Sequence, residues 1–224
     1  MIAASGPHAN QPVASAGAPI ENAAVAMVMV HGRGGVPEGI LDLAHAINRP
    51  RVAYIAPAAA GGTWYPFPFI SPRKKNEPGI SSGLSVIESL VTGLIDRGFA
   101  PHQIAILGFS QGACLSSEFA IRHPRRYGGV LVLSGGLIGA PGTTWDDVTT
   151  TALKDTPVFL GCSDVDSHIP KQRVLESEQV FQRLGARVRR TLYHGMGHVV
   201  NEDEIAEVER VVDEMLENTQ SWNH

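Results

Sequence analysis

The chain has 224 residues, of which 43% are hydrophobic and 18% charged, a balance typical of one globular α/β domain with a sizeable core. The formal net charge of −4 gives no electrostatic reason to expect nucleic acid or an anionic membrane surface as a partner. The two cysteines do not make a disulfide framework, and no apolar run approaches the roughly 20 residues that span a bilayer.

The first 20 residues are weakly patterned. We expect residues 1–20 to be a weakly ordered segment or an edge hairpin, and residues 21–224 to form a single domain. The N-terminus is rich in Ala, Ser, Gly and Pro but lacks the positive region and long apolar core of a signal peptide. The default location is therefore the cytoplasm. Cys114 and Cys162 stand among apolar or small residues, so we expect two buried free thiols.

Apolar runs alternate with amphipathic segments along the chain. Short apolar runs of about four to eight residues are typical of buried strands, and apolar residues spaced by three and four are typical of helices that cover a sheet. The expected strands, in chain order, are at 24–30, 51–56, 104–107, 129–134, 157–161 and 187–193. A helix is expected after each strand except that at 129–134. In chain order, these helices run from Pro37 to Pro50, from a cap at Ser81 or Ser82 to Gly98, from the strand at 104–107 to Pro124, from the strand at 157–161 to Gly185, and over about 202–217. This alternation predicts an α/β domain with one mostly parallel sheet and helices on both faces.

A serine stands at the junction of one predicted strand and the helix after it. Residues 108–112 read Gly-Phe-Ser-Gln-Gly, which fits the pattern G-x-S-x-G. Such a turn strains the serine and exposes its oxygen above the sheet, and the two glycines let strand and helix approach each other. The pattern alone is often only a turn. The strand before it and the helix after it favour a nucleophilic role for Ser110, and the helix N-terminus favours negative charge in front of that serine.

Four further polar side chains follow predicted strands, as Ser110 does. They are His31, Asp164, Asp166 and His198. Ligands of such sheets bind beyond the carboxyl ends of the parallel strands. Five polar side chains at one edge of the sheet therefore indicate a functional site rather than a turn that merely carries a polar residue.

A serine hydroxyl needs a base to take its proton, and His198 is the best candidate. It follows the last strand and two glycines that let its loop bend back, whereas His194 stands before those glycines. The histidine in turn needs a carboxylate to orient it. Asp166 is favoured over Asp164, which is then expected to be a turn or capping residue. The chain order Ser, Asp, His is the one expected of an α/β-hydrolase fold.

The tetrahedral intermediate of such a reaction needs backbone N–H donors for its oxyanion. Gln111, directly after the serine, is expected to supply one, and Arg33 in the glycine-rich loop the other. Because these are main-chain roles, we expect the side chains of Gln111 and Arg33 to tolerate substitution. His31 is expected to support this loop rather than act as a base. The loop lacks the spacing of a P-loop or a dinucleotide fingerprint.

A long loop over residues 57–80 carries several aromatic side chains, which form either an apolar wall or lid over the substrate or a loop packed on the core. Trp64 and Tyr65, with His31 and Gly32 of the earlier loop, are the residues we expect nearest the substrate. The basic run 73–75 is expected to be a solvated loop tip. Nothing in the pattern calls for a metal or a cofactor.

Four of these motifs together resemble the phospholipase/carboxylesterase family, which includes acyl-protein thioesterases and small bacterial carboxylesterases. The motifs are His-Gly-Arg-Gly-Gly at 31–35, Gly-Phe-Ser-Gln-Gly at 108–112, Asp-Ser-His-Ile-Pro at 166–170 and Gly-Met-Gly-His at 195–198. The resemblance extends from about Val25 to Leu216 and is greatest to the bacterial branch. It implies an α/β-hydrolase fold, the triad Ser110, Asp166 and His198, and oxyanion donors at Arg33 and Gln111.

The chain departs from the thioesterases of that family at several positions. Cys162 and Ser163 replace the usual His-Gly before the acidic motif, and Ser167 replaces a proline. Arg33 and Gly35 differ from the usual Leu and Asp. These changes leave the triad intact and weaken the expectation of long-chain acyl-protein specificity.

The sequence therefore predicts a serine carboxylesterase that hydrolyses small to medium carboxylic esters through an acyl-enzyme, with a small-molecule ester as its partner. An acyl thioesterase or a lysophospholipase is the alternative within enzymes. A lactone hydrolase is less favoured, because its relatives usually place a cysteine at the elbow. A non-catalytic ligand-binding module on a hydrolase fold is the alternative of another class. The oligomeric state stays open, a homodimer included.

Overall fold

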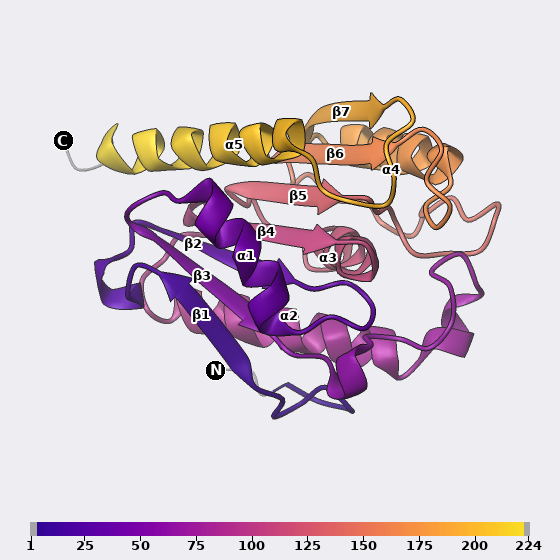
Figure 1. The fold of residues 1–224 in the computed structure, drawn as a ribbon, viewed down its shortest axis with the longest axis horizontal. Coiled ribbons are helices and arrows are strands. Elements are labelled where there is room, and N and C mark those ends of the chain that lie inside the picture. Colours follow the sequence, from indigo (N-terminus) through magenta and orange to yellow (C-terminus); the bar gives the residue numbers. More distant parts are fainter. Residues whose placement is uncertain (1–3, 222–224) are drawn as a thin grey trace.

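The apolar runs of the sequence form one seven-stranded sheet, seen in a computed structural model that describes residues 4–221 (Figure 1). The interior strands are fully buried, which explains why they are continuous apolar runs without polar alternation. In chain order the strands are β1 (Val13–Gly17), β2 (Val25–Val30), β3 (Val52–Pro57), β4 (Ile104–Phe109), β5 (Gly129–Leu133), β6 (Pro157–Ser163) and β7 (Arg187–Tyr193).

The strands lie in the order β1-β3-β2-β4-β5-β6-β7, and all neighbours are parallel except β1 and β3. The order reverses direction at β2, since β3 lies on one side of it and β4 on the other. Such a switch point opens a crevice beyond the carboxyl ends of the two strands. The loops after β2 and β4 are the glycine-rich loop and the turn that carries Ser110.

Helices cover both faces of the sheet, so the predicted α/β architecture with one mostly parallel sheet is confirmed. The apolar sides of α1 and α5 pack with one face of the strands, and those of α2, α3 and α4 pack with the other (Figure 1). The helices are α1 (Pro37–Ile47), α2 (Gly79–Ile95), α3 (Gln111–Arg122), α4 (Lys171–Arg183) and α5 (Glu202–Ser221).

Local signals set most helix ends. Pro37 is the first residue of α1, and α3 ends at Arg122, two residues before a proline. The expected serine cap of α2 is wrong, because α2 already begins at Gly79. Ser82 lies inside the helix, and its hydroxyl donates a hydrogen bond to the carbonyl of Ser5 instead. This serine serves tertiary packing rather than capping.

The N-terminal segment packs against the body of the protein. Strand β1 is an edge strand, but its partner is β3 and not a chain neighbour, so the two do not form a hairpin. His8 is buried; its Nε2–H donates to the carbonyl of Trp64 and its Nδ1 accepts the N–H of Ala60. Residues 1–3 of this segment and 222–224 of the expected domain lie outside the described residues.

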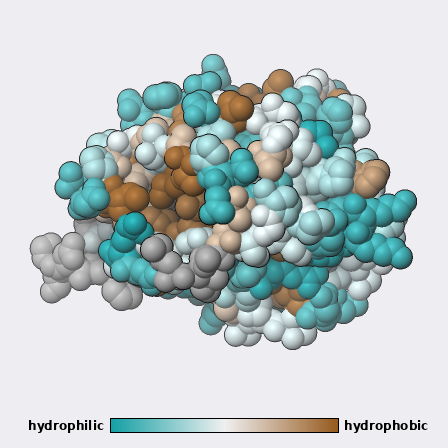
Figure 2. Space-filling view, turned by 90° about the horizontal axis from the view of Figure 1, so that it is seen from below, coloured by the Kyte–Doolittle hydropathy of each residue, from teal (hydrophilic) through white to brown (hydrophobic). Residues whose placement is uncertain are grey.

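The face shown in Figure 2 is covered mostly by hydrophilic or intermediate residues, with hydrophobic residues gathered in one area on its left. None of the helices within residues 4–221 combines the length and the hydrophobicity of a transmembrane helix. The polar residues singled out in the sequence lie in the loops at the carboxyl edge of the sheet.

Candidate active site

Ser110 stands alone between a strand and a helix. It follows β4 directly, precedes α3 and has a left-handed backbone (φ 55°, ψ −119°), the strained turn that the sequence pattern predicts. The glycine two residues later is needed for close approach, since a Cβ on Gly112 would lie 2.1 Å from the carbonyl oxygen of Val30. The neighbouring strand β2 therefore presses against the start of α3, and the Ser110 side chain is held at the edge of the sheet.

His198 and Asp166 complete a chain of hydrogen bonds that begins at Ser110. His198 Nε2 lies 2.7 Å from Ser110 Oγ, and His198 Nδ1 lies 2.7 Å from Asp166 Oδ2. A carboxylate only accepts hydrogen bonds, so Nδ1 carries the proton and Nε2 is free to accept the serine O–H. Three side chains from loops after β4, β6 and β7 thus meet in the order that proton transfer from the serine requires.

The side chain of Asp166 is completely buried but remains the acidic member of this chain. Burial by itself raises the pKa of its carboxyl. Hydrogen bonds from His198 and from the backbone N–H groups of His168 and Ile169 outweigh burial, and the net pKa is lowered. The Asp166 carboxylate is therefore held charged opposite the imidazole.

A second Asp–His pair joins the same two loops. Asp164 Oδ2 lies 2.9 Å from His194 Nδ1, and Asp164 Oδ1 accepts the N–H of Gly195. His194 makes no contact with Ser110, and its side chain is 96% exposed. Asp164 thus holds the turn after β7, which is the turn role expected for it.

The two expected oxyanion donors are unoccupied backbone amides. Within residues 4–221, neither the N–H of Arg33 nor that of Gln111 donates a hydrogen bond. Gln111 is the first residue of α3, where helix N–H groups have no partner inside the helix. Both residues line the cavity beside Ser110, so two donors are available where an oxyanion would form.

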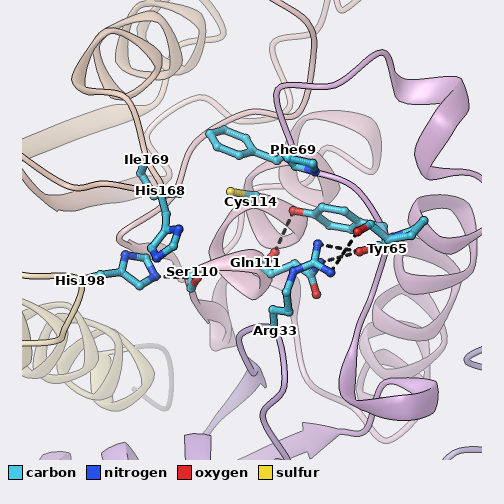
Figure 3. A pocket seen from close by; sticks show the side chains of 11 residues that line it. Arg33, Tyr65, Phe69, Ser110, Gln111, Cys114, His168, Ile169 and His198 are labelled. Carbon is cyan, nitrogen blue, oxygen red and sulfur yellow. Dashed lines mark hydrogen bonds between the residues drawn. The ribbon is translucent and has the colours of Figure 1, made fainter.

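A cavity of about 430 Å³ opens in front of Ser110 (Figure 3). His198 and His168 stand at one end, with ring centroids 4.8 Å apart, while Arg33 and Tyr65 stand at the Gln111 end. The lining residues are Arg33, Tyr65, Pro66, Pro68, Phe69, Ser110, Gln111, Cys114, His168, Ile169 and His198. Its size suits a small organic ligand, and its walls are largely apolar.

Two of the residues expected nearest the substrate are buried supports instead. Trp64 is fully buried and donates its indole N–H to the carbonyl of His31, so it lies beneath the cavity rather than in its lining. His31 is also buried; its Nδ1–H donates to the carbonyl of Gly32 and its Nε2 accepts the N–H of Ala59. Burial lowers the pKa of His31, which keeps this ring neutral.

Gly32 and Tyr65 complete the set expected nearest the substrate. Gly32 lies behind the serine, since a Cβ there would be 3.2 Å from Ser110 Cβ. Tyr65 lines the cavity, and its hydroxyl donates to the carbonyl of Gln111. Of the four residues, only Tyr65 therefore faces the cavity.

The side chains of Gln111 and Arg33 have partners of their own, besides the main-chain roles expected of these residues. The amide of Gln111 accepts the N–H of Trp64 and donates to the carbonyl of Tyr65, both at 2.8 Å. The guanidinium of Arg33 donates to the carbonyls of Tyr65, Pro66 and Phe67. Both side chains thus hold the loop that forms the cavity wall.

Further residues that hold this wall carried no local signal. Asn76 is fully buried and bonds the backbone of Phe67 and Pro68. Arg73 was expected in a solvated tip but forms an ion pair with the buried Glu118 on α3. The Arg73–Glu118 pair joins residues 45 positions apart in the chain, a contact that single-sequence patterns do not reveal. Within residues 4–221, no cluster of three or more His, Cys, Asp or Glu side chains is arranged to hold a metal ion.

Comparison with known proteins gives the same family from sequence and from structure. Residues 11–216 match the sequence model of a family described as Phospholipase/Carboxylesterase. Acyl-protein thioesterase 1 of Kluyveromyces lactis is 32% identical over 140 residues, which are 62% of this chain and 61% of that protein. Its counterpart in Debaryomyces hansenii is 26% identical over 213 residues, 85% of this chain and 91% of that protein. The alignment with the first of these relatives spans about three-fifths of that relative's length.

Among solved structures, a phospholipase/carboxylesterase from Dyadobacter fermentans superposes with a TM-score of 0.87 at 35% identity, covering 93% of this chain and 99% of that one. Esterase PE8 superposes with a TM-score of 0.76 at 20% identity, covering 90% and 97% of the two chains, and supports the fold alone.

Proposed function

The chain belongs to the phospholipase/carboxylesterase family of α/β-hydrolases, and on that premise we propose that it is a serine carboxylesterase acting on small to medium carboxylic esters. The observation that carries the proposal is the unbroken chain of hydrogen bonds from Ser110 through His198 to Asp166 at the mouth of a cavity. A serine with its base and orienting carboxylate already in place is the arrangement that acyl transfer needs.

In the first half of the proposed reaction, Ser110 Oγ attacks the ester carbonyl carbon while His198 Nε2 takes the hydroxyl proton. Asp166 stabilises the imidazolium that results. The carbonyl oxygen becomes an oxyanion and accepts the N–H groups of Arg33 and Gln111. When the intermediate collapses, the bond to the alcohol oxygen breaks, and His198 gives its proton to the departing alcohol. The acyl group stays on Ser110.

In the second half, a water molecule takes the place of the alcohol. His198 removes a proton from the water as its oxygen attacks the acyl-enzyme, and the same two amides hold the second oxyanion. Collapse breaks the bond to Ser110 Oγ, which recovers its proton from His198. The carboxylic acid leaves, and the enzyme returns to its starting state without any cofactor.

The cavity supports small to medium esters as substrates. Its volume of about 430 Å³ suits a ligand of modest size, and Tyr65, Phe69 and Ile169 supply apolar contact for a hydrocarbon group. A thioesterase is the second candidate, because the sequence relatives are named acyl-protein thioesterases. The same serine mechanism serves both ester and thioester substrates. A lysophospholipase remains an alternative from the sequence.

The direct test of the proposal is the rate of ester hydrolysis by wild type and Ser110→Ala. A panel of esters and thioesters of graded acyl length identifies the preferred class. We expect Ser110→Ala to keep less than about a thousandth of the wild-type kcat/KM on the best substrate. A fluorophosphonate probe is expected to label Ser110 in the wild type. Folded wild-type protein that neither takes the probe nor hydrolyses any member of the panel would point to a non-catalytic binding module.

The cytoplasmic location and the homodimer stay predictions from the sequence. Gel filtration with light scattering measures the oligomeric state, and fractionation of cells that express the protein measures its location.

A further inference from the structure

The cavity in front of Ser110 has one feature that hydrolysis of a neutral ester does not use. Arg33 brings a full positive charge to a wall that is otherwise largely apolar. None of the described residues that line the cavity is an Asp or a Glu. Within residues 4–221, Arg33 also forms no ion pair. This cation therefore faces the substrate site without a protein counter-ion.

The hydrogen bonds of Arg33 orient its charge but do not neutralise it. All its partners are backbone carbonyls, those of Tyr65, Pro66 and Phe67, and they are reached through Nη1 and Nη2. A guanidinium has five N–H donors. The Nε–H group and one Nη1–H of Arg33 donate to no residue in the described part of the chain. A fixed guanidinium with spare donors is a prepared partner for one carboxylate oxygen.

The position of Arg33 shows which part of a substrate it would meet. The departing alcohol must lie near His198, because that ring gives it a proton. Arg33 stands on the other side of Ser110, beyond Gln111 and beside Tyr65 (Figure 3). The acyl part of the ester takes this end of the cavity. The two histidines of the lining, His168 and His198, lie side by side at the alcohol end.

On the basis of the proposed function, we infer that Arg33 makes the enzyme selective for acyl groups that end in a carboxylate. The substrate class is the monoester of a short dicarboxylic acid. The ester carbonyl lies at Ser110, a few methylene groups pass along Tyr65, and the distal carboxylate accepts the spare N–H groups of Arg33. A purely structural Arg33 would hold the wall through its three carbonyl partners and give no such selectivity.

The test compares matched esters with one leaving group. Monoethyl succinate, glutarate and adipate are paired with ethyl butanoate, pentanoate and hexanoate, which have the same number of acyl carbons and no distal charge. The measured quantity is the ratio of kcat/KM for the anionic ester to that for its neutral partner at low ionic strength. We expect a ratio of about ten for at least one chain length, and a fall of this ratio in 0.5 M salt.

Arg33→Met removes the charge, and Arg33→Gln removes it while keeping an N–H donor for the wall. Both variants are expected to lower the anionic-to-neutral ratio about tenfold, and Arg33→Lys to keep part of it. The ratio is compared within one variant, so a general loss of activity from a displaced wall or amide cancels. Arg126→Met is the matched control, because it removes the same charge from an exposed arginine outside the cavity lining.

A second measurement does not depend on how the variants fold. Free glutarate and pentanoate are compared as inhibitors of neutral-ester hydrolysis by the wild type, and glutarate is expected to bind more tightly. A separate control uses the folded Arg33 variants: the butanoate ester of glycolate carries its carboxylate on the alcohol, and its kcat/KM relative to ethyl butanoate is expected to be the same in wild type and variants.

The inference is supported if the anionic-to-neutral ratio of kcat/KM exceeds about three in the wild type and both Arg33→Met and Arg33→Gln lower it at least threefold. Any other result with folded variants overturns the inference. If neither variant folds, inhibition by glutarate at least threefold stronger than by pentanoate decides in favour, and weaker discrimination decides against. The proposed function fails separately, since that failure is an absence of Ser110-dependent hydrolysis of all esters, neutral ones included.

Discussion

Two Asp–His pairs connect the loop after β6 to the loop after β7, and only one of them reaches Ser110. In the outer pair, Asp164 Oδ2 lies 2.9 Å from His194 Nδ1. In the inner pair, Asp166 Oδ2 lies 2.7 Å from His198 Nδ1. The two pairs consist of the same residue types, and their oxygen-to-nitrogen distances are similar. The difference lies in the surroundings: the side chain of His194 is 96% exposed, whereas that of His198 is 20% exposed. An Asp–His pair is therefore not by itself a sign of catalysis.

The titration of the carboxylates does not separate the pairs either. The pKa of Asp164 is lowered first by the N–H of Gly195 and then by His194. The pKa of Asp166 is lowered by its hydrogen bonds in spite of burial. What distinguishes the inner pair is that the ring of His198 packs against Phe109 at 5.1 Å and presents Nε2 to the serine. Packing that aims the second nitrogen is the property that the outer pair lacks.

The largest effect expected from this comparison comes from the histidines. His198→Ala removes the imidazole that is hydrogen-bonded to Ser110 Oγ, so we expect kcat/KM for an ester to fall by about 10⁴-fold or more. His194→Ala leaves the inner pair untouched and is expected to change kcat/KM by less than about threefold. Steady-state kinetics of the two variants, with circular dichroism as a check on folding, measure the difference. Equal losses in the two folded variants would contradict it.

The aspartates give the second test. Asp166→Asn removes the charge that holds His198 in its donor tautomer and stabilises the imidazolium, and we expect a loss of at least about 100-fold in kcat. Asp164→Asn affects only the turn after β7 and is expected to cost less than about threefold. The same assay measures both. The reverse ranking of the two variants would assign the orienting role to Asp164.

The smallest effect concerns the start of α5, which follows His198 closely in the chain. The side chain of Asn201 accepts the N–H of Glu204, and Oε2 of the buried Glu204 accepts the N–H of Asn201. Its other oxygen, Oε1, lies against Gly161 and has no hydrogen-bond partner within residues 4–221. Burial raises the pKa of Glu204 from 4.5 to about 7.

A carboxyl group with a raised pKa binds its proton more tightly in the folded state than in the unfolded state. Its contribution to stability is full below pH 4.5 and is lost as the pH rises through about 7. Glu204→Gln keeps the capping box but does not ionise, so we expect it to raise the free energy of unfolding at pH 8.5 by about 2 kcal/mol.

The expected gain at pH 5 is much smaller than at pH 8.5, and urea denaturation at the two pH values measures it. Glu202→Gln, at an exposed position on the same helix, controls for the loss of one charge from the first turn of α5. A gain for Glu204→Gln that is equal at both pH values would show that the group does not ionise in this range.

The sequence by itself determined the elements and the edge of the sheet at which the polar residues gather. Buried parallel strands are continuous apolar runs, and the G-x-S-x-G turn depends on neighbours within five residues, so both are readable locally. Ser110, Asp166 and His198 are therefore recognisable as candidates from the sequence.

Only the tertiary structure decided which aromatic side chains face the cavity and which side chains hold its wall. Trp64 and Tyr65 are adjacent in the chain, yet Trp64 is buried against His31 while Tyr65 lines the cavity. Likewise, the side chains of Arg33 and Gln111 acquire their partners from a loop more than 30 residues away. Such contacts depend on how distant loops pack and on which donors and acceptors burial leaves to be paired, and no local pattern carries that information.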